Sequence, residues 1–183
     1  ALRGRLPGRQ LVKQAGLDSQ QESALFDALQ RKAKPEINQM LSSWQLAGKI
    51  NQMLLALADL NGDGEVIGKA ESVLAAASAE VKSAIAELKQ IAEAITAKIP
   101  GISLHYDLAE LRGYHYHTGV VFAAFVQDKG SAIAQGGRYD GIGKVFGNAR
   151  PATGFSSDLK TLLAFNTEAV VQQACIFAPG DPD

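Results

Sequence analysis

Length, composition and charge describe a globular chain and exclude several other classes. The chain has 183 residues, of which 46% are apolar, and its formal net charge is -1 at pH 7. A chain of this length and apolar content can bury a sizeable core. The balanced charge gives no global attraction to nucleic acid, and no apolar run reaches the length of a membrane span. We therefore expect a soluble chain with no membrane partner.

The single cysteine indicates a reducing compartment. Cys175 lies in the apolar run Ala-Cys-Ile-Phe over 174–177, so we expect a buried thiol rather than a nucleophile or a disulfide partner. A cytoplasmic location follows from that expectation. The chain begins at Ala1 without a targeting signal, and residues 179–183 have the composition of a linker. These ends predict a fragment of a longer polypeptide.

Composition divides the chain near Pro100. Ala, Leu, Lys and Glu dominate before this point, and Gly, Val, Phe and Tyr become frequent after it. The first set favours helices and the second favours strands and turns. We therefore expect a mainly helical segment over 1–100, a second unit over 101–178, and a linker or the start of a further segment over 179–183.

The first segment is expected to contain long helices over 19–34 and 36–60. A third helix is predicted by apolar residues that recur every three or four positions and are followed by Pro100 and Gly101, which end it. The small residues over 75–78 fit either a helix interior or a connection, and we favour a helix. The residues of the periodic stripe are Val81, Ile85, Leu88, Ala92, Ile95 and Ile99.

The second segment has the pattern of an antiparallel sheet. Residues 120–126 are continuously apolar, which predicts a buried strand, and the polar residues 127–130 predict a turn. Residues 131–135 would then form the hairpin partner. Together with the helical segment this gives an α+β fold with a mainly antiparallel sheet. Further expected elements are strands over 104–108 and 174–177 and a helix over 156–165.

Two patterns imitate metal sites without completing them. Residues 59–66 resemble the start of a calcium-binding loop, but its twelfth position is Ala70, where a bidentate carboxylate is required. His105, His115 and His117 lack an evident geometry for a metal. We therefore expect no metal site, and we expect residues 59–66 to connect two helices.

Several basic residues could contact phosphates, but charge near a chain terminus is usually solvated. We expect this ordinary role for all of them. They are Arg3, Arg5, Arg9 and Lys13 near the start of the chain, followed by Arg31, Lys32 and Lys34.

Two glycine-framed motifs carry polar groups suited to a small amino acid. Residues 112–119 read Arg-Gly-Tyr-His-Tyr-His-Thr-Gly, and residues 136–141 read Gly-Gly-Arg-Tyr-Asp-Gly. A guanidinium can hold a carboxylate, phenol and imidazole groups can recognise a polar ring, and glycines let the backbone approach a ligand. The second motif lacks the spacing of a phosphate-binding loop. The alternative for the aromatic and histidine side chains is packing in a core or an interface.

The order and spacing of these motifs resemble those of histidyl-tRNA synthetases and of their non-catalytic relatives, the regulatory subunits of ATP phosphoribosyltransferase. The resemblance runs from about residue 103 to residue 165 and includes a third motif over 150–155. It implies the last strands and helix of a class II aminoacyl-tRNA synthetase-like core, preceded by a helical insertion. It also implies that Arg112 contacts the carboxylate or acyl group of the histidine substrate and that Tyr139 contacts the imidazole. The full set of implied histidine-binding residues is Arg112, Tyr116, His117, Gly136, Gly137 and Tyr139.

Two departures from the synthetases favour the regulatory subunits. His115 and His117 stand where synthetases carry Asp and Tyr. The arginine that holds ATP phosphate in class II enzymes aligns with Thr161, which carries no positive charge. Lys160 would point about 100° away from that position on a helix. The resemblance therefore implies no catalytic residues and no adenylate chemistry. The alternatives are a divergent histidyl-tRNA synthetase and a scaffold that has lost its ligand.

The regulatory reading implies a partner protein. In that family the chain joins a short-form catalytic subunit of ATP phosphoribosyltransferase, which performs the first step of histidine biosynthesis. It activates this subunit and takes part in feedback inhibition by L-histidine. We expect a homodimer within a hetero-oligomer, no cofactor and no bound tRNA. A pocket made from Arg112, Tyr116 and Tyr139 lacks a group for the histidine ammonium, so we expect weak binding or none by this chain alone.

Overall fold

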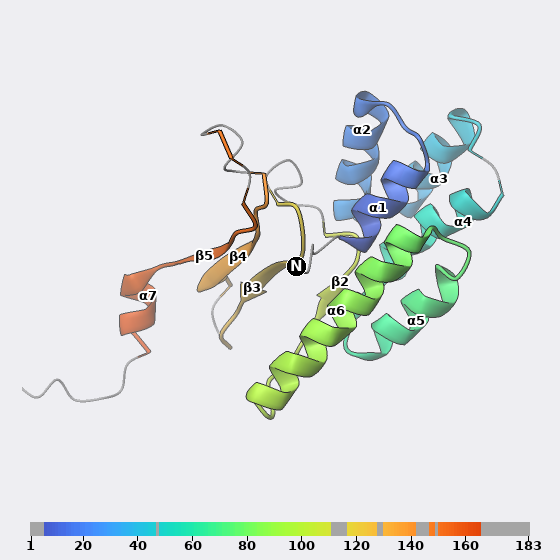
Figure 1. Cartoon of the computed structure of the whole chain (residues 1–183). Coiled ribbons are helices and arrows are strands. Elements are labelled where there is room, and N and C mark those ends of the chain that lie inside the picture. The colour runs from blue at the N-terminus through green and yellow to red at the C-terminus, as the bar shows by residue number, and fades with distance from the viewer. Residues whose placement is uncertain are drawn as a thin grey trace, which may run out of the picture.

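The computed structural model describes residues 6–46, 48–110, 117–127, 130–141, 147–148 and 150–165. These residues form a helical unit and a separate antiparallel sheet that is followed by a short helix (Figure 1). The helices are α1 (Pro7–Gln14), α2 (Ser19–Gln30), α3 (Lys34–Ser43), α4 (Lys49–Ala56), the 3-10 turn η1 (Leu57–Asp59), α5 (Glu65–Val73), α6 (Ala79–Lys98) and α7 (Leu159–Leu163). The strands are β1 (Asn61–Gly62), β2 (Tyr106–Asp107), β3 (Val121–Ala124), β4 (Ala134–Arg138) and β5 (Thr153–Ser157). The predicted α+β class is confirmed.

Helix α6 confirms the periodic stripe. Ser78 caps its N-terminus by accepting a hydrogen bond from the backbone N–H of Val81 at 3.4 Å. The stripe is buried where α6 packs on other helices, at Val81 and Ile85. It emerges at the C-terminal end, where Ile99 is 55% exposed and the helix extends past its neighbours (Figure 1).

The helix predicted over 19–34 is confirmed as α2, which ends at Gln30, whereas the helix predicted over 36–60 is wrong, because it is interrupted between α3 and α4. Lys32 has φ 54° and Gln45 has φ 57°, and Gly48 has φ 71°. A residue at positive φ cannot continue a right-handed helix. The chain therefore turns sharply between α2 and α3 and again between α3 and α4, which lets short helices pack around one core.

Two further features of the helical unit differ from expectation. The run over 75–78 is a connection, because Leu74 ends α5 and Ser78 caps α6. Helix α1 was not predicted, since its basic residues hid a short apolar face. That face buries Leu11 and Val12 completely.

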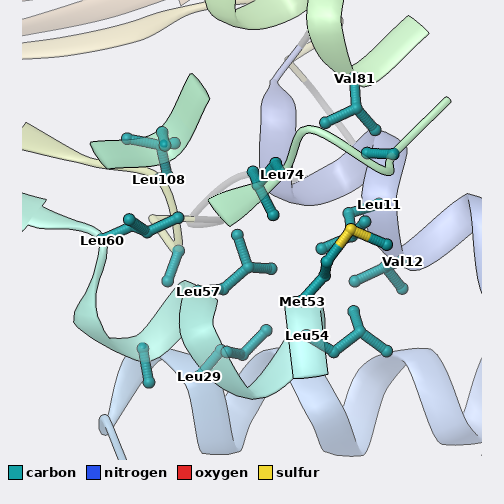
Figure 2. Close-up of a cluster of buried hydrophobic side chains, with 14 of the residues drawn as sticks. Leu11, Val12, Leu29, Met53, Leu54, Leu57, Leu60, Leu74, Val81 and Leu108 are labelled. Carbon is teal, nitrogen blue, oxygen red and sulfur yellow. The ribbon is translucent and has the colours of Figure 1, made fainter. Parts of the chain in front are cut away.

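One apolar core holds the helical unit together. Figure 2 shows side chains from α1, α2, α4, η1 and α6 converging on it. Within the described ranges no polar or charged side chain is buried, so burial of apolar surface is the main source of stability. Fully buried members include Leu11, Leu29, Leu54, Leu57, Leu60, Leu74 and Val81, and Leu108 is 4% exposed.

Residues after α6 return to the helical unit. Strand β2 pairs with β1 through Asn61↔Asp107 and Gly62↔Tyr106, so the strand expected over 104–108 is confirmed at its centre. The backbone N–H of Leu108 donates to the carbonyl of Leu60 at 3.0 Å. Lys32 Nζ lies 2.6 Å from Asp107 Oδ1. The chain immediately before the first glycine-framed motif is thus fixed to the helices.

The loop that imitates a calcium site uses its oxygen atoms for local contacts. Asp59 pairs with Lys34 at 2.7 Å. Asp63 Oδ1 accepts a hydrogen bond from the backbone N–H of Glu65 at 3.2 Å. Asn61 Nδ2 donates to the carbonyl of Ala58 at 3.0 Å. These contacts stabilise a connection between η1 and α5, as the sequence predicts.

The second sheet has the order β3-β4-β5 and is antiparallel throughout. The predicted hairpin is confirmed by the pairs Val121↔Gly137 and Ala124↔Ala134, although β4 starts later than residue 131. The expected burial of the strand over 120–126 is wrong in this chain: Phe122 is 47% exposed. An apolar run predicts burial, but the layer that would cover it depends on residues distant in sequence.

The segment after Gly154 is part strand and part helix. Ser156 and Ser157 of β5 pair with Gln135 and Ala134 of β4. The helix expected from residue 156 therefore begins later, at Leu159. Asp158 caps α7 by accepting from the backbone N–H of Lys160 at 2.9 Å. The strand expected over 174–177 lies outside the described residues. Across the parts that the structure does describe, no helix is long and apolar enough to cross a membrane.

Candidate functional site

The candidate site lies on one face of the β3-β4-β5 sheet. Residues directly opposite each other in an antiparallel sheet share a face, and the pairs Val121↔Gly137 and Gly137↔Gly154 place these three residues together. Two of them are glycines, so the centre of the face has no side chains. The result is a bare backbone floor that aromatic rings can approach.

Two rings cover this floor. A Cβ at Gly137 would lie 2.8 Å from Cδ2 of His117, and a Cβ at Gly154 would lie 3.6 Å from Cε2 of Tyr139. The centroids of the two rings are 4.8 Å apart, with an interplanar angle of 37°. His117 comes from the first motif and Tyr139 from the second, so the fold brings the two motifs together.

Hydrogen bonds fix the two motifs to each other. The backbone N–H of Thr118 donates to the carbonyl of Arg138 at 2.8 Å. Thr118 Oγ1 accepts from the backbone N–H of Asp140 at 2.7 Å. The backbone N–H of Tyr139 donates to the carbonyl of Ala152 at 2.8 Å, which adds the third motif. Nothing in the residue pattern indicates that Thr118 links the motifs.

The charged residues of the second motif pair with each other. Arg138 Nε lies 2.9 Å from Asp140 Oδ1 and 3.1 Å from Oδ2, and both side chains are largely covered. A partly buried ion pair with good geometry holds its backbone more firmly than an exposed pair. Arg138 therefore stabilises the turn that carries Tyr139.

Gly136 has a different task from Gly137. A Cβ at Gly136 would collide with the carbonyl oxygen of Gly154 and with the backbone of Phe155. Consecutive residues of a strand face opposite sides of the sheet. The double glycine thus permits the close approach of β5 on one side and of the His117 ring on the other.

Arg9 joins the helical unit to this face. Its Nη1 donates to the backbone carbonyl of His117 at 2.9 Å. The expectation that Arg9 is simply solvated is wrong, because it is partly buried in this contact. The residue type does not indicate that Arg9 contacts the His117 carbonyl, because this contact depends on helix α1, which the sequence pattern did not predict. Three other described basic residues of this group form ion pairs, Arg31 with Asp27 and Glu36, Lys32 with Asp107, and Lys34 with Asp59, and Lys13 is exposed.

The structure places four of the six predicted histidine-binding residues. His117, Gly137 and Tyr139 meet at the glycine floor, whereas Gly136 faces the opposite side of the sheet. Arg112 and Tyr116 lie outside the described residues, and their roles stay predictions. Tyr139 Oη donates to the carbonyl of Gly154 at 3.4 Å, a long bond that a ligand could replace.

A recess of about 670 Å³ lies elsewhere, between α5, α6 and β2. Its lining includes Ile67, Ala92 and Tyr106, and Glu71 and Lys89 lie 3.6 Å apart beside it. Burial raises the pKa of Tyr106 above its ordinary value. The recess is open and separate from the glycine floor, and none of its described lining residues belongs to the motifs.

The fold places the chain in a class of proteins. A histidyl-tRNA synthetase/ATP phosphoribosyltransferase regulatory subunit from Bacillus halodurans has a similar structure, with a TM-score of 0.73 at 24% identity over 88% of this chain and 42% of that one. A histidine–tRNA ligase subunit from Alicyclobacillus acidocaldarius gives 0.63 at 25% identity over 87% and 50%. The fold is that of class II aminoacyl-tRNA synthetases.

The family follows from the sequence match. The family model described as histidyl-tRNA synthetase covers residues 8–162, and the chain therefore belongs to that family. A relative from Thioalkalivibrio sulfidiphilus is 51% identical over 176 residues, which are 96% of this chain and 45% of the relative. One from Pseudomonas paraeruginosa is 52% identical over 175 residues, 94% and 44% respectively. Both are named ATP phosphoribosyltransferase regulatory subunit, and the chain spans less than half the length of each.

Proposed function

We propose that the whole protein is the regulatory subunit of ATP phosphoribosyltransferase and that this chain carries part of its L-histidine site. Two kinds of relationship support the proposal: family membership, and relatives of about half identity that carry this name. The observation that carries the site assignment is the pair of rings from His117 and Tyr139 over a glycine floor. Such a face suits the flat, polar ring of a histidine ligand.

Each part of the ligand has a candidate partner in this proposal. Tyr139 can donate to or accept from a ring nitrogen of the imidazole. Arg112 can hold the carboxylate in bidentate fashion. Tyr116 and His117 complete the polar wall, Gly137 admits the His117 ring, and Gly136 contributes through the close approach of β5 to β4. The ammonium group needs a further partner, so we expect the whole protein to bind histidine more tightly than this chain.

Helix α7 supports a non-catalytic role. Thr161 stands where the resemblance expects an arginine, and its backbone N–H completes the cap of Asp158 at 3.3 Å. A neutral hydroxyl at this position cannot stabilise charge on a phosphate as a guanidinium does. Lys160 is exposed beside it. We infer that a short-form catalytic subunit carries out the phosphoribosyl transfer. This subunit would bind a homodimer of the regulatory subunit in the cytoplasm, and tRNA would take no part.

The test combines two assays on full-length protein. The protein is mixed with a short-form catalytic subunit, co-elution is followed by size-exclusion chromatography, and formation of phosphoribosyl-ATP is measured with and without histidine. We expect a complex with a changed rate. Separate elution and an unchanged rate would refute the regulatory function. The second assay is histidine-dependent ATP–pyrophosphate exchange, where synthetase-level activity would instead establish a divergent histidyl-tRNA synthetase.

A further inference from the structure

We propose that α1 is a clamp on Leu108 and His117 and that Arg9 is a positioning residue for the ligand face. The clamp rests on the proposed histidine site for its functional meaning, but its geometry is independent of any ligand. Consecutive residues of α1 contact the chain just before and just after residues 111–116. One contact is steric and the other is a hydrogen bond.

The steric contact is made by Gly8. A Cβ at this position would collide with the carbonyl oxygen of Leu108 and approach Cδ1 of Leu57 to 3.8 Å. The backbone of α1 therefore lies directly on the backbone of Leu108, as only glycine permits. Leu108 is itself fixed, because its side chain is buried and its N–H donates to the carbonyl of Leu60 at 3.0 Å.

The hydrogen bond is made by Arg9. Its guanidinium reaches the carbonyl of His117 at 2.9 Å, a residue that follows Leu108 in the chain. A charged donor gives a stronger bond than a neutral one. The next residue, Thr118, bonds to both Arg138 and Asp140 of the second motif. Holding the His117 carbonyl thus also sets the junction of the two motifs.

Helix α1 is rigid enough to act as a clamp. Its residues Leu11 and Val12 are fully buried, and it packs on α6. Gln14 Oε1 also accepts from the backbone N–H of Ser78 at 2.9 Å, which ties the end of α1 to the start of α6. Arg9 therefore connects the ligand face to the whole helical unit. Any effect of helix packing on ligand affinity must be matched by an equal effect of the ligand on helix packing.

The experiment uses full-length protein with Arg9→Ala, Arg9→Lys and the control Lys13→Ala. Lys13 is an exposed cation on the same helix, so its removal matches the charge change without the contact. Two quantities are measured: the histidine dissociation constant by calorimetry, and the NMR shifts of the His117 ring, which the nearby Tyr139 ring influences. The unfolding free energy of each variant is measured separately to identify simple loss of stability.

We expect Arg9→Ala to weaken histidine binding about tenfold, as for loss of one charge-assisted hydrogen bond, and to shift the His117 resonances. Arg9→Lys should cause a smaller loss of histidine affinity and a smaller shift of the His117 resonances, because an ammonium can still donate to one carbonyl. Lys13→Ala should change neither. If Arg9→Ala resembles Lys13→Ala in both measurements, the clamp is refuted. If wild-type protein binds no histidine, the proposed ligand is wrong, and the shift of the His117 resonances alone tests the clamp. If Arg9→Ala does not fold, Arg9→Lys is compared with wild type in the same two measurements.

Discussion

Gly137 determines how closely the His117 ring approaches the central strand. A Cβ there would be 2.8 Å from Cδ2 of His117 and 3.0 Å from the carbonyl oxygen of Val120. One of these neighbours is backbone, so the ring has to move instead. The ring pair over the glycine floor depends on this single missing methyl group.

Gly137→Ala should therefore displace His117 and destabilise the chain by about 1–3 kcal/mol, as overpacking usually does. Histidine binding by the full-length protein should fall as well, since the ring forms one wall of the proposed site. Urea unfolding and calorimetry measure the two effects. Gly130→Ala is the matched control, because nothing lies within 4 Å of a Cβ at that exposed glycine. Equal stability of the two variants would contradict the packing of His117 on Gly137.

Tyr106 gives the helical unit a dependence on alkaline pH. Burial raises its pKa in the folded state, so the unfolded chain loses the phenol proton first as the pH increases. The contribution of this group is complete below the unfolded pKa of about 10 and declines as the pH rises through the folded value. Tyr106→Phe should flatten the fall in unfolding free energy above about pH 10. Denaturant titrations at several pH values check this, and an unchanged slope would show that Tyr106 is not desolvated.

At the scale of elements, α1 depends on a glycine that helices normally disfavour. Gly8→Ala should destabilise the protein by about 1–3 kcal/mol because of the collision with Leu108. The control is Gly68→Ala, at an exposed position of α5 with nothing within 4 Å. There the same substitution should stabilise by roughly 0.5–1 kcal/mol, since alanine is the better helix former. Thermal or urea unfolding shows whether the two changes have opposite signs, and a neutral Gly8→Ala would show that α1 does not touch Leu108.

Periodicity predicted α6 because a long helix repeats its apolar spacing over many turns. The break at Gln45 could not be predicted, since a positive φ at a residue other than glycine follows from packing and has no signature in residue type. The antiparallel hairpin was predictable from its turn. The exposure of Phe122 was not, because burial depends on what packs above the strand.

The same distinction applies to the candidate site. His117, Gly137 and Tyr139 could be nominated because motif order and spacing carry the resemblance. Arg9 could not, because its contact with His117 spans 108 positions and its helix is short. Local patterns indicate which residues belong to a motif, whereas long-range contacts decide what holds the motif in place.

At the scale of the whole molecule, the face of the sheet opposite the glycine floor is apolar and open. Phe122 and Phe155 lie on this face on either side of Gly136, and Phe155 is 71% exposed. Leu159 and Leu163 of α7 are also largely exposed, at 70% and 61%. Exposed apolar side chains of this kind favour association.

The chain alone should therefore bind a hydrophobic dye such as ANS and self-associate as its concentration rises. Phe155→Ser should reduce dye fluorescence and association with little loss of stability, because the side chain is mostly exposed. Ile102→Ser is the control, since Ile102 is 40% exposed but precedes β2 and is not part of the sheet. Light scattering and dye titration make the measurement. An equal effect of both substitutions would show that the sheet face is not the surface that binds the dye and drives self-association.

The clamp made by α1 has a consequence for synthesis on the ribosome. Gly8 and Arg9 are translated about 100 residues before the positions that they hold, so at roughly 5–20 residues per second they wait on the order of 5–20 seconds for those partners. During this interval the apolar face of Leu11 and Val12 lacks α6 and is open to water and to chaperones. The ligand face thus reaches its final form only after Leu108 and His117 have been synthesised and have bound to α1 near the start of the chain.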